Sequence, residues 1–172
     1  MKINFRPCKI DGLPQLQSLS VTTFSDAFAS QNNPSDFQIY LEKAFSLQQL
    51  EFELANPNTS FFFVENLDTI IGYFKLNVNE AQMELKEALG MELERIYILA
   101  SFQGKGIGSK ILQFIEQLAR DYGKHYLWLG VWEQNIEAIR FYERHGYYKF
   151  DQHPFYIGSD EQTDWLLKKE LI

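Results

Sequence analysis

Residues 103–112, QGKGIGSKIL, place three glycines and two lysines immediately before an apolar stretch with helical spacing. The positions of Ile107, Ile111 and Ile115 predict a helix that begins within the glycines. Residues 91–99, MELERIYIL, are apolar on both faces in their second half, which predicts a central strand before the glycines. A strand, a glycine-rich bend and a helix in this order indicate an α/β fold in which unpaired backbone N–H groups can meet an anion.

Two common nucleotide-binding motifs do not match the glycine stretch. A P-loop, G-x-x-x-x-G-K-[ST], counted from Gly104 needs a second glycine where Ser109 stands. The dinucleotide fingerprint G-x-G-x-x-G needs a third glycine at Ser109 or Ile111, and it belongs to the first strand of a fold, whereas this stretch lies past the middle of the chain. A coenzyme phosphate on the backbone and a turn without a ligand remain as interpretations.

Apolar periodicity and turn residues divide the rest of the sequence into short elements. We expect helices over residues 13–29, 37–45, 47–54, 107–122 and 135–146, and an amphipathic helical insert over residues 80–90. We expect strands over residues 2–8, 60–65, 70–78, 91–99, 125–131, 146–150 and 163–171. This order predicts one α/β domain over residues 1–172, with a mixed central sheet flanked by helices.

Charge and composition narrow the choice of partner and compartment. The 172 residues carry 23 acidic and 16 basic side chains, so we do not expect the basic surface that nonspecific nucleic-acid binding requires. An acidic surface suits a cationic substrate, although solubility explains it equally well. No stretch approaches the ~18 apolar residues of a membrane span, and residues 1–10 lack a secretory apolar region. The single cysteine, Cys8, excludes an internal disulfide, so we expect a cytoplasmic protein.

The glycine stretch also resembles that of a known family. Residues 103–108, QGKGIG, match the Q/R-x-x-G-x-G/A motif of the GNAT superfamily of acetyl-CoA-dependent N-acetyltransferases. Residues 93–99 are similar to the family's central strand, and residues 127–150 to its next strand and its N-x-x-A-x-x-F-Y-x-x-x-G-[FY] segment. Residues 22–46 and 156–171 are similar to bacterial PaiA-type spermidine/spermine acetyltransferases. The resemblance implies the GNAT fold with splayed central strands, and direct transfer of acetyl from acetyl-CoA to a primary amine, foremost a polyamine.

The resemblance also implies where the coenzyme lies. Its pyrophosphate is expected on the backbone of the glycine loop, and its pantetheine arm beside the central strand, where the Ile98 N–H would hold the oxyanion formed on attack. Asn135 is expected to contact the coenzyme, to cap a helix, or both, while Arg144 meets either a phosphate or solvent. The coenzyme-binding residues that we expect are Ile96, Tyr97, Ile98, Gln103, Gly104, Lys105, Gly106, Ile107, Gly108, Ser109, Asn135 and Arg144.

Tyr142 and Glu94 are the expected catalytic residues. Tyr142 occupies the family's F-Y-x-x-x-G frame, and a phenol that is protonated at neutral pH can give a proton to the leaving thiolate. Because an alkylammonium titrates near about 10.4, a base must take its proton before attack. Glu94 stands where many GNAT enzymes have a glutamate, on the strand face that Glu92 and Ile96 should share, and Glu92 is the alternative base. A half-buried tyrosine and a strand-start carboxylate are the structural alternatives.

The remaining candidates and rival functions carry less support. Asp26 and Asp36 are candidates for binding a cationic amine, with a solvated surface role as the alternative. His125, His145 and His153 show no metal-ligand spacing, so we expect no metal. The rival functions are acetylation of another small amine, an amino acid or a protein N-terminus, and sensing of acetyl-CoA without catalysis. A homodimer is a further expectation, because homodimers are widespread in the superfamily that the chain resembles.

Overall fold

The strands form one mixed seven-stranded sheet. The structure, a computed structural model, describes residues 1–171. The strand order is β1-β2-β3-β4-β5-β7-β6, and all neighbouring pairs are antiparallel except β4 and β5, which are parallel. The strands are β1 (Ile3–Pro7), β2 (Thr59–Asn66), β3 (Thr69–Val78), β4 (Gly90–Ile98), β5 (Tyr126–Trp132), β6 (Tyr148–Ile157) and β7 (Asp160–Glu170).

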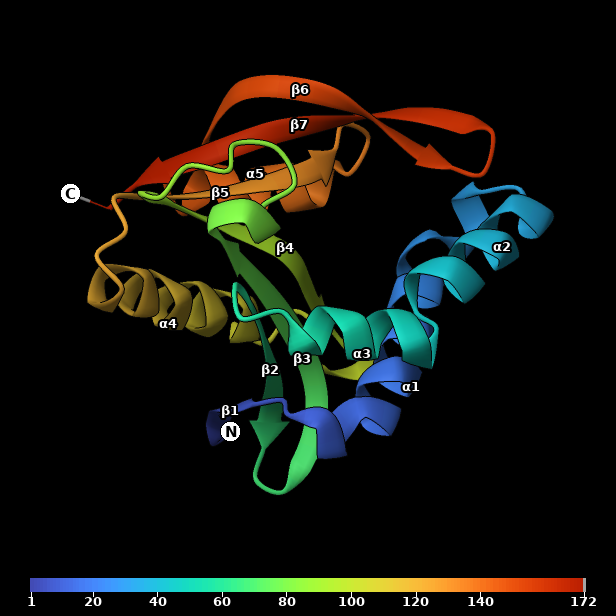
Figure 1. Ribbon diagram of the computed structural model, residues 1–172, viewed down its shortest axis with the longest axis horizontal. Coiled ribbons are helices and arrows are strands. Elements are labelled where there is room, and N and C mark those ends of the chain that lie inside the picture. The colour runs from blue at the N-terminus through green and yellow to red at the C-terminus, as the bar shows by residue number, and fades with distance from the viewer. Residues whose placement is uncertain (172) are drawn as a thin grey trace.

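The α-helices cover both faces of this sheet. One face carries α1 (Leu13–Phe28), α2 (Pro34–Ala44) and α3 (Leu47–Ala55), whose apolar side chains form one buried cluster with β2 and β3. The other face carries α4 (Ile107–Asp121) and α5 (Ile136–Arg144), which belong to a second buried cluster. Figure 1 shows α1–α3 gathered around one end of the sheet, with α4 at the opposite side. The α/β fold with a mixed sheet and flanking helices is therefore confirmed.

The strand β2 separates the two buried clusters. Phe61 and Phe63 join the cluster of α1–α3, whereas Phe62 and Val64 join the cluster of α4 and α5. Successive side chains of a strand point to opposite faces, so an apolar run such as FFFV fits only a strand that is covered on both sides. Burying each of these side chains contributes about 1.5–3 kcal/mol to folding.

The central strands β4 and β5 pair only at their beginnings. Gly90, Met91 and Glu92 align with residues 126–128 of β5, and within the described chain the ladder between the two strands goes no further. The strands then diverge, as the ribbon shows between β4 and β5 (Figure 1). This divergence confirms the predicted splay of the central strands and leaves one edge of β4 open.

The helical insert predicted over residues 80–90 is wrong. Only Asn79–Ala81 form a short 3-10 turn, and the chain then winds around the buried side chain of Gln82. The Gln82 amide donates to the carbonyls of Asn79 (3.3 Å) and Glu87 (2.9 Å), and its oxygen accepts from the Trp128 indole (2.7 Å). One buried amide thus takes over carbonyls that a helix would have paired with its own backbone.

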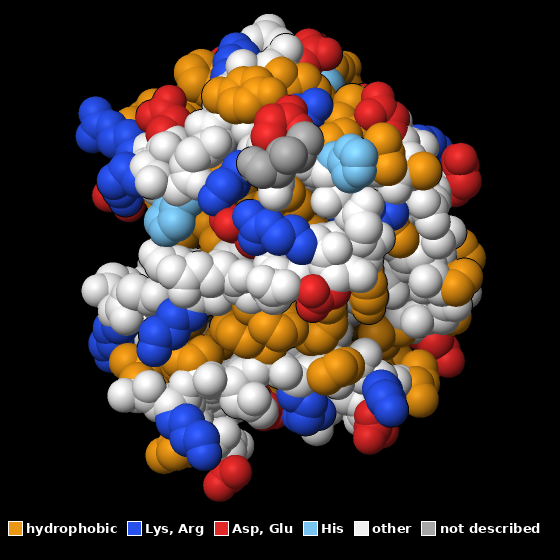
Figure 2. Space-filling model, turned by 90° about the vertical axis from the view of Figure 1, so that its left-hand side faces the viewer, with side chains coloured by type: hydrophobic (Ala, Val, Ile, Leu, Met, Phe, Trp, Pro, Cys, Tyr) orange, Lys and Arg blue, Asp and Glu red, His pale blue; other side chains and the backbone are white. Residues whose placement is uncertain are grey.

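The C-terminal hairpin is longer than the sequence predicted. β6 continues to Ile157, past Pro154, where the predicted strand ended at Phe150, and β7 already begins at Asp160. Proline lacks an N–H and is tolerated in β6 because β6 is the edge of the sheet. Figure 2 shows the side of the molecule on which α4 lies, where Lys/Arg and Asp/Glu side chains intermingle with apolar ones.

Candidate active site

The glycine loop begins α4 with a left-handed backbone. Gly104 has φ +71 and Gly106, the residue that precedes the helix, has φ +73, a region that favours glycine. A β-carbon added at either glycine would meet no atom within 4 Å, so the backbone lies open on its outer side. The N–H groups of the first helical turn lack helical partners and carry the positive end of the helix dipole. The predicted junction of strand, glycine bend and helix is confirmed, and its geometry fits a phosphate group.

Side chains fix this loop to its surroundings. The Gln103 amide donates to the carbonyl of Ile98 (3.0 Å), which ties the loop to the end of β4. The Ser109 hydroxyl lies 2.9 Å from Nε2 of His145, whose Nδ1 lies 2.7 Å from a carbonyl of α5. Lys105 remains exposed and donates to the carbonyl of Ser101 (2.8 Å). The loop is therefore anchored at both ends while its backbone stays accessible.

The open edge of β4 presents two backbone N–H groups to the gap. The Leu99 N–H donates to the carbonyl of Ile71 on β3 (2.8 Å). Backbone groups alternate in direction along a strand, so the N–H groups of Ile98 and Ile96 point the other way, toward the gap between β4 and β5. The side chains of Ile96 and Ile98 pack in the cluster of α4 and α5. Their backbone N–H groups are thus available to a ligand along this edge.

A cleft of about 250 Å³ opens where β4 and β5 separate. Its lining combines aromatic rings with three carboxylates, Glu92, Glu94 and Asp164. The aromatic walls come from α1, α2, β5 and β6 and include Phe24, Phe28, Tyr40, Trp128, Trp132 and Phe155. Apolar walls with a few convergent polar groups are typical of small-molecule sites.

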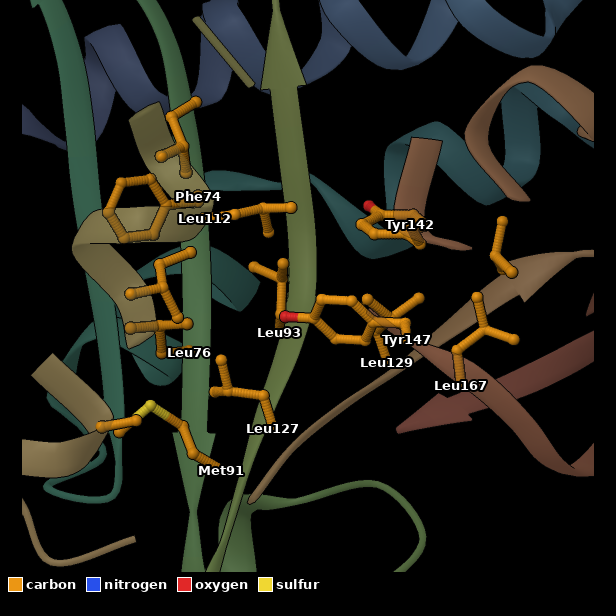
Figure 3. Close-up of a cluster of buried hydrophobic side chains, with 14 of the residues drawn as sticks. Phe74, Leu76, Met91, Leu93, Leu112, Leu127, Leu129, Tyr142, Tyr147 and Leu167 are labelled. Atoms are coloured by element: carbon orange, nitrogen blue, oxygen red, sulfur yellow. The ribbon is translucent and has the colours of Figure 1, made fainter. Parts of the chain in front are cut away.

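Tyr142 reaches this cleft from α5. Its side chain is 7% exposed and packs against Tyr147, with ring centroids 5.6 Å apart. Figure 3 shows both hydroxyls directed toward β4, the strand that carries Leu93. Burial raises the pKa of Tyr142 well above its ordinary value, so the phenol stays protonated over the physiological range. A protonated phenol at the cleft can donate a proton.

Glu94 belongs to a buried group of ion pairs. Its carboxylate lies 2.5 Å from Lys75 Nζ and 3.5 Å from Arg95 Nη2, and it accepts from Asn77 (2.6 Å). Glu53 of α3 pairs with the same two cations at 3.0 Å. Burial raises the pKa of Glu94, but Arg95 and Lys75 outweigh it and hold the pKa below its usual range. Glu94 is therefore a weak proton acceptor.

Glu92 has the opposite electrostatic setting. Its side chain is 3% exposed, and its Oε2 accepts from the Met83 N–H (2.9 Å) and from Asn77 (3.0 Å). Burial raises the pKa of Glu92 to about 7, and the hydrogen bond from Asn77 offsets only part of that rise. A carboxylate that titrates near neutral pH is suited to accept a proton at the pH where an enzyme works.

A β-bulge explains why Glu94 differs from its expected position. Lys75 aligns with Arg95 and Leu76 with Leu93, so Glu94 has no partner on β3. The expectation that Glu94 and Ile96 share one strand face is wrong, because the extra residue shifts the alternation. Ile96 packs toward α4 and α5, whereas the Glu94 carboxylate meets Lys75 on the face of α1–α3.

Of the other predicted residues, Asn135 lines the cleft, whereas Arg144, Asp26 and Asp36 do not. The Asn135 side chain caps α5 by accepting from the Ala138 N–H (3.2 Å), and Asn135 also lines the cleft. Arg144 is exposed in the last turn of α5. Asp26 is exposed on α1, while Asp36 meets the turn between β6 and β7, and neither lines the cleft.

Sequence reasoning missed the part of the cleft formed by the C-terminal hairpin. Gly130 of β5, His153 of β6 and Asp164 of β7 all line it. Burial raises the pKa of Asp164 to about 6, and His153 opposes that rise. The available signal was the sequence WLGVW, in which Trp128, Gly130 and Trp132 share one strand face. The residues that line the cleft beside this face lie on β6 and β7, and the sequence alone does not show how these strands align with β5.

Comparison with known proteins identifies the family. The model of the acetyltransferase (GNAT) family matches residues 21–147. The chain belongs to the GNAT family. An uncharacterized N-acetyltransferase in the pepI 3′ region of Lactobacillus delbrueckii subsp. lactis is 42% identical over 160 residues, which cover 93% of this chain and 92% of that protein. The GNAT chain described here is therefore an N-acetyltransferase, and the family implies acetyl-CoA and a small-molecule acceptor as its substrates.

Two further relatives concern polyamines or coenzyme A. The spermine/spermidine N(1)-acetyltransferase of Bacillus subtilis is 43% identical over 56 residues, which cover 32% of this chain and 37% of that protein. The PaiA N-acetyltransferase of Thermoplasma acidophilum, solved in complex with coenzyme A, is 21% identical with a TM-score of 0.80 over 99% of both chains. The second likeness confirms the GNAT fold of this chain.

Among residues 1–171 no three His, Cys, Asp or Glu side chains are grouped so that they could hold a metal ion. Over the same part of the chain no helix is long and apolar enough to cross a membrane.

Proposed function

We propose that this GNAT enzyme acetylates a primary amine of a polyamine such as spermidine, by direct attack in a ternary complex. The observation that carries the proposal is the cleft at the splay of β4 and β5, which brings Tyr142 and Glu92 together with the open edge of β4. The Bacillus subtilis relative, whose name gives spermine and spermidine as its substrates, supports the choice of amine. The acidic and aromatic lining of the cleft suits a flexible cation.

Each part of the site has a separate role in this proposal. Acetyl-CoA supplies the thioester whose acetyl group is transferred. The backbone of residues 103–109 binds its pyrophosphate, and the Ile98 N–H donates to the carbonyl oxygen where charge develops. Tyr142 donates a proton to the departing sulfur. The other expected coenzyme contacts, among them Asn135 and Arg144, remain part of the proposal.

We propose Glu92 as the base, in place of Glu94. A proton must leave the ammonium group before the amine can attack, directly or through a water molecule. Glu92 has a pKa near 7 because it is buried, whereas Glu94 is held ionised by Lys75 and Arg95. Glu94 then acts as a positioning residue that fixes Asn77, the shared partner of both carboxylates.

We further propose that residues 1–172 act as one catalytic domain in the cytoplasm. Cys8 is buried, and burial raises the pKa of its thiol to about 11. A thiol with that pKa is inert and needs no oxidising compartment.

Release of free CoA thiol from acetyl-CoA, measured with and without spermidine between pH 6 and 9, tests the proposal. We expect release that depends on spermidine and rises with pH. Tyr142→Phe should lower kcat about 100-fold while the Kd for CoA stays unchanged, because the ring keeps its packing and loses only the proton. The control is Tyr122→Phe, at an exposed tyrosine at the end of α4.

Two results would contradict the proposal. An equal rate of thiol release with and without spermidine, in a protein that binds acetyl-CoA, would exclude the polyamine as acceptor. Full turnover in Tyr142→Phe would exclude Tyr142 as the proton donor.

A further inference from the structure

A notch in the cleft lies over Gly130 of β5. Gly130 stands between Trp128 and Trp132 on the strand face that lines the cleft. A β-carbon added at Gly130 would lie 3.5 Å from Asp164 Oδ2 and 3.8 Å from His153 Nε2. The absence of a side chain at Gly130 therefore leaves room for a small group between two tryptophans, a carboxylate and an imidazole.

Asp164 is the ionised carboxylate of the cleft that lacks a close partner. Glu94 and Glu53 of α3 share two cations, Lys75 and Arg95, so the two negative charges are balanced by two positive ones. The Asp164 side chain is only 16% exposed, yet within residues 1–171 its carboxylate accepts no hydrogen bond, and His153 Nε2 lies 3.9 Å away. His153 itself pairs through Nδ1 with Glu84. A mostly buried carboxylate without a protein donor favours the binding of a cation or a donor beside it.

The notch and the proposed base lie at different levels along β5. On the two sides of β5, Glu92 aligns with Trp128 and Asp164 aligns with Trp132. The notch at Gly130 is two residues from the level of Glu92, roughly 7 Å along β5, and the backbone of Asp164 is four residues away, roughly 13 Å. A molecule that reaches both carboxylates must therefore carry its two polar ends on a chain of several bonds.

We propose that Asp164, over the notch at Gly130, binds a second positive charge of the acceptor and selects dications over monocations. The inference rests on the proposed function, because it assumes that the reacting amine lies near Glu92. The rings of Trp128 and Trp132 flank the second ammonium group, and aromatic faces attract such cations. His153, held by Glu84, limits the notch on the β6 side.

The matched substrates for the test are 1,8-diaminooctane and 1-aminooctane, which differ by one ammonium group. With saturating acetyl-CoA, we expect a KM for the diamine about 10- to 100-fold below that for the monoamine, the effect of one charge-assisted hydrogen bond. Asp164→Asn should raise the KM of the diamine by a similar factor and change that of the monoamine less than about twofold. Glu161→Gln, which removes an exposed carboxylate from β7, is the control and should preserve the preference.

A second variant keeps the test decisive if Asp164→Asn folds poorly. Gly130→Ala adds a methyl group at ordinary contact distance from Asp164 and leaves the charge in place. It should raise the KM of the diamine selectively, because the methyl group fills the notch. An unchanged preference in Gly130→Ala, or an equal change for both amines in Asp164→Asn, would overturn the proposal.

Calorimetric titration of the two amines into the CoA-bound enzyme separates this inference from the proposed function. Diamine binding that depends on Asp164, without acetylation of any amine, would support the anchor and refute the transfer to amines. Acetylation of both amines with equal KM and equal affinity would refute the anchor and leave the transferase standing. Failure of the diamine to bind at all would overturn the anchor.

Discussion

At the scale of single residues, two carboxylates two positions apart on β4 titrate in opposite directions. Burial raises the pKa of Glu92 to about 7, whereas Arg95 and Lys75 outweigh burial and lower the pKa of Glu94. A residue type and a spacing therefore do not determine a catalytic role; the neighbours of each carboxylate do.

Glu92→Gln should lower kcat at least about 100-fold and abolish the rise of the rate with pH around 7, because the amide cannot accept the proton. The pH–rate profile of kcat with spermidine measures the effect. Glu94→Gln is the comparison variant, and it should retain the pH dependence. If the inflection near pH 7 disappears in Glu94→Gln and persists in Glu92→Gln, the assignment of the base is reversed.

Glu92→Gln should also change how the free energy of unfolding depends on pH. The folded state holds the Glu92 proton up to about pH 7, while the unfolded chain releases it near 4.5. The free energy of unfolding that is linked to Glu92 is therefore fully present below pH 4.5 and is lost as the pH rises to 7. Relative to Glu92→Gln, the wild type should lose up to about 3 kcal/mol over this interval in urea titrations.

What the sequence predicted at this scale follows from local chemistry. Gly106 and Asn135 could be assigned because a left-handed glycine and a helix cap depend on a few neighbouring residues. The environment of Glu94 could not be predicted, because the β4 bulge arises from pairing with β3 and the ion pairs reach Glu53 of α3. Such contacts join residues far apart in the chain.

At the scale of elements, the loop before α4 combines an unusual backbone with an open surface. Gly106→Ala should cost about 1–2 kcal/mol of stability, because alanine disfavours a left-handed conformation. It should also weaken CoA binding more than about 10-fold, because the strain falls where backbone N–H groups meet phosphate. Urea unfolding and calorimetric titration of CoA measure the two effects.

Gly123→Ala is the matched control for Gly106→Ala. Gly123 lies just beyond the other end of α4, has φ +68 and has open space where a β-carbon would lie. We expect a similar loss of stability without a loss of CoA affinity. Equal losses of affinity in both variants would show that the glycine loop has no special part in binding.

The elements themselves were predictable where a periodic pattern met a turn residue. The hairpin of β2 and β3 and the helix α4 follow such patterns and lie close to their predicted bounds. Residues 80–90 were mistaken for a helix, because amphipathic spacing does not reveal that Gln82 becomes buried against Trp128. The extension of β6 past Pro154 depends on its place at the sheet edge, which the sequence does not state.

At the scale of the whole molecule, the ion pairs of Lys75 join α3, β3 and β4. Lys75→Met would leave Glu53 and Glu94 with one cation in place of two, in a region where Lys75 is 5% exposed. Removing one partner of a buried pair costs about 3–5 kcal/mol. We expect a loss of this size in the free energy of unfolding from urea titration.

Arg6→Met provides the contrast, because Arg6 pairs with Glu65 at 2.7 Å near the surface. A surface pair contributes about 0–1 kcal/mol, so this variant should stay close to the wild type. The double variant Lys75→Met, Glu94→Gln should recover part of the loss, since the remaining carboxylate keeps Arg95. Equal effects of Lys75→Met and Arg6→Met would contradict a stabilising role for the buried pairs.

The short ladder between β4 and β5 has a mechanical consequence. Three aligned residue pairs at one end join the four strands β1–β4 to the three strands β5, β7 and β6. Beyond these pairs no ladder hydrogen bond joins β4 to β5 within the described residues, so the buried side chains packed across the sheet, and not strand pairing, set the width of the open end. The sheet therefore offers its substrates a gap that is closed at residues 90–92 and 126–128 and widens away from them.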